Sequence, residues 1–96
     1  MSEDCIRLPR GLPSWKARAF QRLVLADTGR YIHLGSTIEK LILQGQPLLC
    51  DVYVALNYSQ YRSLCAVWEK VCALPDHEEA RVPELVYELN QMNAAK

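Results

Sequence analysis

The sequence predicts an all-α fold, a compact domain of four or five short helices. Three observations support this prediction: the chain has 96 residues, half of them are hydrophobic, and apolar residues recur at helical spacing between glycines and prolines. Single domains cluster near ~100–150 residues, so we expect residues 1–96 to form one domain. A chain this short has a thin core, to which a homodimer or a bound partner would add burial.

The first thirteen residues contain two prolines and a glycine, and we expect them to form an irregular arm. A helix should follow from Ser14, which suits the N-cap position, to about Asp27, with Gly29 placed to end it. Helical spacing gives this helix an apolar arc and an outer, basic arc. The apolar arc holds Trp15, Ala19, Phe20, Leu23 and Val24, and the outer arc holds Arg18, Gln21 and Arg22.

Two short segments between residues 36 and 57 are also expected to be helical. Ser36 and Glu39 have the Ser-x-x-Glu spacing of a capping box, and Gly45 would end the helix that they begin. Residues 47–57 start with a proline, which suits the first helical position, and are apolar nearly all round. This pattern is typical of a buried central helix, but a buried strand has the same signature, and the sequence leaves both open.

The second half of the chain has the clearest helical pattern. Residues 58–74 place six apolar side chains on one arc, and Pro75 would end this helix. The acidic residues that follow suit a short helical turn. A last helix should begin at Pro83 and leave a frayed tail over residues 93–96. The expected core holds Trp15, Leu23, Ile42, Leu56, Leu64, Trp68 and Leu89.

Charge is distributed unevenly along a chain whose net charge is zero. Residues 1–30 carry six basic and three acidic side chains, whereas residues 75–96 carry two basic and five acidic ones. Such polarity can orient a partner or favour head-to-tail self-association. It argues against nonspecific binding of nucleic acid, which requires a clear cationic excess. Two ordinary solvated faces would give the same pattern, so that interpretation stays open.

No residue pattern predicts catalysis or a metal site. The four cysteines are 45, 15 and 7 residues apart, whereas zinc ligands are normally paired at short spacings such as Cys-x-x-Cys. We therefore expect no metal and no cofactor, and we interpret the cysteines as small buried hydrophobic residues. The two histidines lie in expected loops and no nucleophile motif is present, so we expect no enzyme activity.

The chain carries no pattern of export or membrane insertion. Its first residues lack a basic stretch followed by an apolar run, and no segment approaches the ~18–20 apolar residues of a membrane span. We therefore expect a cytoplasmic protein with reduced cysteines and without a membrane partner.

The expected function is that of a small regulator, adaptor or inhibitor that binds a protein partner, in a bacterial or phage-encoded context. Apolar residues that fall off the core arcs could anchor such a partner, and charged side chains could steer it. The residues expected to bind the partner are Arg18, Arg22, Leu25, Leu43 and Tyr87. Single exposed leucines also occur without any function, which is the competing interpretation.

Nucleic-acid binding is the alternative function. In this hypothesis the basic arm enters a groove while the first helix contacts phosphates, using Arg7, Arg10, Arg18 and Arg22. The spacing of the segments 37–45 and 47–57 also suggests a helix-turn-helix, but only superficially. The second segment offers few polar side chains, and its Asp51 would repel phosphate.

Overall fold

The computed structural model describes residues 5–56 and 61–95. Its elements are β1 (Cys5–Leu8), α1 (Ser14–Thr28), α2 (Ser36–Leu43), β2 (Val52–Ala55), α3 (Tyr61–Ala73), the 3-10 helix η1 (Asp76–Arg81) and α4 (Val82–Ala94). The two strands form an antiparallel sheet. The prediction of a mostly helical domain is confirmed, whereas a purely all-α class is wrong because of this sheet.

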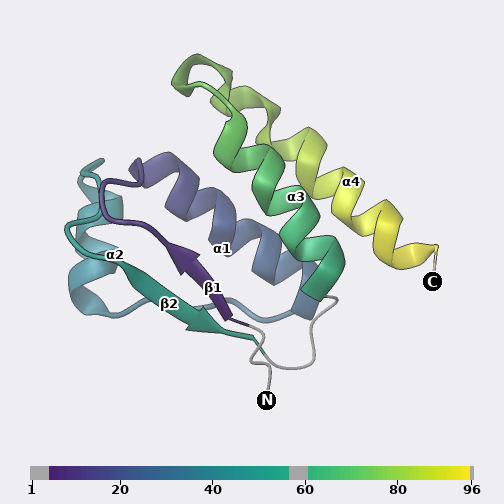
Figure 1. Ribbon diagram of the computed structural model, residues 1–96, viewed down its shortest axis with the longest axis horizontal. Coiled ribbons are helices and arrows are strands. Elements are labelled where there is room, and N and C mark those ends of the chain that lie inside the picture. The colour runs from purple at the N-terminus through teal and green to yellow at the C-terminus, as the bar shows by residue number, and fades with distance from the viewer. Residues whose placement is uncertain (1–4, 57–60, 96) are drawn as a thin grey trace.

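The helix α1 lies at the centre of the fold (Figure 1). It packs against α2, α3 and α4. Figure 1 shows α3 and α4 side by side on one side of α1, with α2 on the other side. The strand β1 precedes α1 along the chain, and β2 connects α2 to the α3–α4 pair, so the sheet joins the two ends of this arrangement.

Three packed neighbours bury much of the circumference of α1. Phe20 is fully buried and meets Trp68 of α3 edge-on, with ring centroids 5.1 Å apart and an angle of 69° between the ring planes. Such pairs contribute stability beyond the apolar area that they bury. Gly29 ends α1 in the left-handed conformation, at a φ of 77°, and its N–H donates to the Leu25 carbonyl. The prediction that Gly29 terminates this helix is therefore confirmed.

The predicted N-caps are wrong by one residue. Ser14 and Ser36 are the first residues of α1 and α2, and neither helix has a side-chain capping hydrogen bond. Glu39 instead accepts a hydrogen bond from the N–H of Leu34 at 2.9 Å. Its carboxylate therefore fixes the loop before α2 and does not complete a capping box with Ser36.

Residues 47–57 contain a strand where a helix is expected. Within the described part of this segment, β2 pairs with β1, which lies inside the arm expected to be irregular. Arg7 and Tyr53 face solvent, and their strand neighbours face the core, which is the period-two alternation of a sheet buried on one side. Pairing with a distant segment satisfies the backbone of this apolar run without a helix. The core side of the sheet includes Ile6, Leu8 and Val54, and Leu56, directly after β2, is buried as well.

The C-terminal half contains the predicted sequence of elements, namely a helix, a short helical turn and a last helix. The helix α3 ends before Pro75, η1 occupies the acidic segment, and Pro83 lies in the first turn of α4. The predicted first turn at residues 58–60 lies outside the described residues, as does residue 96. Because α4 continues to Ala94, the expected frayed tail is helical over its first two residues.

Polar contacts fix both ends of α1. The Trp15 indole donates to Asp76 of η1 at 3.0 Å, and the Asn93 amide of α4 donates to Asp27 at 2.8 Å.

Of the residues expected to form the core, Trp15 is half-buried, in contrast to the others. Those members, Leu23, Ile42, Leu56, Leu64, Trp68 and Leu89, are all buried.

Replacing Phe20 with Ala should lower the free energy of unfolding by about 3–5 kcal/mol, because the transfer energy of the ring is lost and a cavity remains. Phe20→Leu fills part of that space and should cost less. Urea denaturation followed by circular dichroism measures both changes. Leu43→Ala is the control, since Leu43 is 80% exposed and its truncation should change stability by under about 0.5 kcal/mol. Equal losses for the Phe20 and Leu43 variants would contradict the central role of this ring.

Candidate functional site

A groove with a cavity volume of about 460 Å³ lies between α1 and α2. This volume falls within the range of ~300–1,000 Å³ that is typical of ligand-binding clefts. We call it the α1–α2 groove. It is lined by Arg18, Gln21, Arg22 and Leu25 of α1, Tyr31 of the connecting loop, and Glu39, Ile42 and Leu43 of α2.

The wall contributed by α1 is the outer, basic arc of the sequence analysis together with Leu25. Its four residues are spaced i, i+3, i+4 and i+7, so they share one face of the helix. This face is not simply solvated, since α2 packs beside it and Arg18 donates to the Ile42 carbonyl at 3.4 Å. Leu25 lies on this face because it falls off the apolar arc of α1. The apolar arc of α1 therefore packs in the core, and the basic arc lines the groove.

Gln21 is buried at 5% exposure, although helical spacing places it on the outer arc. Its amide nitrogen has two N–H groups and lies within hydrogen-bond distance of three acceptors, the Glu39 carboxylate at 2.8 Å, the Ile32 carbonyl at 3.0 Å and the Tyr31 hydroxyl at 3.1 Å. A buried amide is costly unless such partners are present. Gln21 therefore connects α1, the loop after it and α2, and these contacts set the shape of the groove floor.

The Glu39 carboxylate is the main acceptor of this cluster. It receives hydrogen bonds from the Gln21 amide, the Tyr31 hydroxyl and the Leu34 N–H. Partial desolvation opposes its ionisation, but these three donors together outweigh that effect and lower the pKa of Glu39. The pKa of Tyr31 is raised, and the largest cause is desolvation of its hydroxyl. The hydrogen bond to Glu39 and the negative charge of the Glu39 carboxylate raise it further.

The rim of the groove carries arginine side chains without ion pairs among the described residues, and exposed leucines. Within the residues that the structure describes, the Arg22 side chain makes no hydrogen bond or ion pair, and Arg18 makes only its contact to the Ile42 carbonyl. Leu43 is 80% exposed and Leu25 is 45% exposed. The groove therefore offers two guanidinium groups and two aliphatic anchors to a ligand.

Four of the five residues expected to bind a partner lie in this groove, namely Arg18, Arg22, Leu25 and Leu43. The fifth, Tyr87, is exposed on α4 and does not line it. Sequence reasoning missed Gln21, Tyr31 and Ile42 as groove residues. It singled out Glu39 only as a capping residue.

The structure separates the four arginines of the nucleic-acid hypothesis. Arg7 belongs to β1, where its guanidinium pairs with Asp51 at 3.4 Å, and the N–H of Arg10 donates to the same carboxylate at 2.7 Å. The Arg10 N–H, and then the charge of Arg7, lower the pKa of Asp51 although desolvation opposes them. The described part of the arm is thus tied to the sheet, and neither Arg7 nor Arg10 lines the groove.

The cysteines are less buried than the sequence analysis expects. Cys50 and Cys72 are exposed, Cys5 and Cys65 are half-buried, and all four are free thiols. Over residues 5–56 and 61–95, no three metal-ligating side chains come together. In that same part of the chain, no helix combines the length and apolar character needed to cross a membrane.

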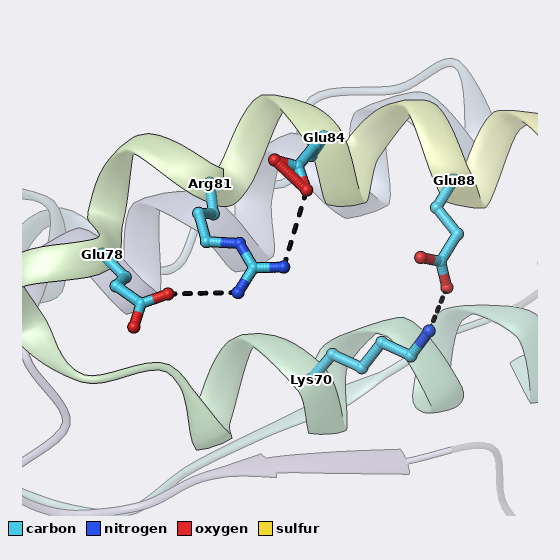
Figure 2. Close-up of polar contacts among 5 residues, drawn as sticks. All are labelled: Lys70, Glu78, Arg81, Glu84 and Glu88. Atoms are coloured by element: carbon cyan, nitrogen blue, oxygen red, sulfur yellow. Dashed lines mark hydrogen bonds and ion pairs between the residues drawn. The ribbon is translucent and has the colours of Figure 1, made fainter.

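A second polar surface lies on α4 and its neighbours (Figure 2). Arg81 pairs with Glu78 at 3.1 Å and with Glu84 at 3.5 Å, and Lys70 of α3 pairs with Glu88. The hydrogen bond from Arg81 to Glu78, and then the negative charges of Glu84 and Glu78, raise the pKa of the Arg81 guanidinium. All of these side chains are at least one-third exposed, and ion pairs at such positions contribute little to stability.

No known protein family, curated protein or solved structure matches the chain.

Replacing Glu39 with Gln should lower the free energy of unfolding at pH 7 by about 1 kcal/mol, because a charged acceptor of three hydrogen bonds is lost. The pKa of Glu39 is lowered on folding, so its contribution is complete above its ordinary value of 4.5. That contribution disappears as the pH falls through the folded-state pKa. Urea unfolding should therefore show a difference between wild type and Glu39→Gln that shrinks from pH 7 to about pH 3.

Glu69→Gln is the matched control, since Glu69 is exposed on α3. It should change stability little at either pH. A stability difference for Glu39→Gln that stays constant over the whole range would show that the carboxylate does not act through its charge.

Proposed function

We propose that the protein is a small non-enzymatic regulator, adaptor or inhibitor that acts in the cytoplasm by binding a protein partner in the α1–α2 groove. One observation carries the proposal. Four residues that the sequence predicts to bind a partner line a single groove, namely Arg18, Arg22, Leu25 and Leu43.

The composition of the groove suits a protein ligand. Binding hot spots combine apolar anchors with arginines, surrounded by a polar rim that excludes water. Leu43 and Leu25 supply exposed aliphatic surface, and Ile42 adds a buried apolar side chain to the lining. The walls are two helices, and a groove between helices is a common seat for an amphipathic helix of a partner.

The same geometry gives less support to nucleic acid as the ligand. Only two of the four arginines in that hypothesis line the groove, and Arg7 is already paired with Asp51. The Glu39 carboxylate in the lining already accepts three hydrogen bonds inside the protein, so Arg18 and Arg22 are the cations that the lining offers to a phosphate chain. Apolar anchors such as Leu43 contribute nothing to phosphate binding. The pull-down described below therefore includes a nuclease treatment, which distinguishes a nucleic-acid ligand from a protein.

Leu43→Glu should abolish capture of the partner, because it places a charge where an apolar anchor is required. The measurement is a pull-down with the tagged full chain from a lysate of the cells that produce it, treated with nuclease and analysed by mass spectrometry. Leu49→Glu is the matched control, since Leu49 is 65% exposed and does not line the groove. Circular dichroism should show unchanged helicity for both variants.

A protein that is retained after nuclease, lost with Leu43→Glu and kept with Leu49→Glu would support the proposal. Equal capture by the two variants would exclude the groove as the binding surface. Loss of all captured material on nuclease treatment would make nucleic acid the ligand. In that case Arg18→Ala with Arg22→Ala should weaken binding and flatten its dependence on salt.

A further inference from the structure

We propose that the α1–α2 groove also accepts the outer face of α4 from a second copy of this chain. This inference rests on the proposed binding role of the groove, and it names a partner of defined chemistry for that site. It accounts for Tyr87, the one expected binding residue that lies outside the groove.

The outer face of α4 carries acidic and polar side chains, of which Glu84, Tyr87 and Gln91 are exposed and Glu88 is half-buried. Its residues Glu84, Tyr87, Glu88 and Gln91 are spaced i, i+3, i+4 and i+7, so they share an arc of about 100°. The buried residues of this helix, Val82, Leu85 and Leu89, occupy the opposite side. Tyr87 is 65% exposed between two carboxylates, which makes it an amphipathic anchor in an acidic setting.

The two surfaces match in spacing and in charge. The α1 wall of the groove presents Arg18 and Arg22, and the α4 face presents Glu84 and Glu88. Both pairs are four residues apart, so the charges within each pair are separated by about 6 Å along the helix axis. A helix laid along α1 can therefore bring both carboxylates to both guanidinium groups, while Tyr87 reaches the apolar side chains of the groove.

The charges involved are able to change partners. Arg22 has no ion pair within the described residues, so a carboxylate from another chain would meet an uncommitted guanidinium. Glu84 and Glu88 are held only by exposed pairs with Arg81 and Lys70 (Figure 2). Exposed pairs of this kind contribute about 0–1 kcal/mol, so exchanging or sharing them costs little.

The contact must form between two copies. Figure 1 places α2 and α4 on opposite sides of α1, so the α4 face cannot reach the groove of its own chain. Each copy carries one groove and one α4 face, and the two surfaces differ, which defines a head-to-tail contact. The charge distribution of the sequence has the same polarity, with a basic excess in residues 1–30 and an acidic excess in residues 75–96.

Sedimentation equilibrium of the purified full chain tests the proposal. The weight-average mass should rise above the monomer value of 11.0 kDa with concentration at about 50 mM NaCl, and should return toward it at about 0.5 M NaCl. Arg18→Gln with Arg22→Gln should weaken the association constant about tenfold or more, as should Glu84→Gln with Glu88→Gln. Circular dichroism should confirm that both double variants keep their helicity.

A mixture of the two double variants tests directly whether the groove of one copy binds the α4 face of another. One of them retains an intact α4 face and the other an intact groove, so a mixture contains one functional contact and should form a 1:1 dimer that does not grow further. Two matched controls neutralise the same number of charges elsewhere and should associate like wild type. They are Arg30→Gln with Arg62→Gln, and Glu69→Gln with Glu79→Gln.

A chain that stays monomeric at low salt up to about 1 mM would overturn the inference. Association that the Glu84 and Glu88 substitutions do not weaken would overturn it as well, since the α4 face would then not be the occupant. Neither result contradicts the proposed function if the pull-down still captures a protein with the wild-type chain and loses it with Leu43→Glu. Failure of the self-contact and failure of the binding role are thus distinguishable.

Discussion

The edge-on contact between Phe20 and Trp68 joins α3 to α1, the helix against which α2 and α4 also pack. The helix α1 packs against α3, α4 and α2, and its basic arc lines the groove beside α2. That arc cannot make a dry interface, since two of its four residues are arginines. Gln21 provides a polar link to α2 and its loop, and a groove remains beside it. The groove is therefore a consequence of how α1 is shared among three helices.

The helices could be predicted from the sequence because their signals are local. Apolar spacing, Gly29 and the prolines at 75 and 83 mark the helices within a few residues of their observed ends. The sheet could not be predicted in this way, because β1 and β2 are far apart in the chain and neither strand shows its partner. The run at residues 47–57 is apolar enough for a buried helix, and only its pairing with β1 decides for a strand.

The groove was predictable only in part, for a related reason. Leu25 and Leu43 stand out because they fall off the apolar arcs of their helices, and that signal is present in the sequence. Gln21 is polar on a polar arc, so nothing local distinguishes a buried amide from a solvated one. Its burial depends on Tyr31 and Glu39 arriving from the next loop and helix. The spacing of Ser36 and Glu39 does mark Glu39 as a structural carboxylate, although with a different hydrogen-bond partner.

The groove residues divide into those that hold it open and those that face outward. Gln21 and Glu39 have their hydrogen bonds satisfied inside the protein, so changing them alters the fold as well as the site. Arg22 and Leu43 lie at the rim and contribute little to folding, because one has no ion pair among the described residues and the other is 80% exposed. A surface with such residues at its rim can be altered without loss of the fold. The groove wall and the outer face of α4 carry opposite charges at the same helical spacing, with Arg18 and Arg22 on α1 and Glu84 and Glu88 on α4.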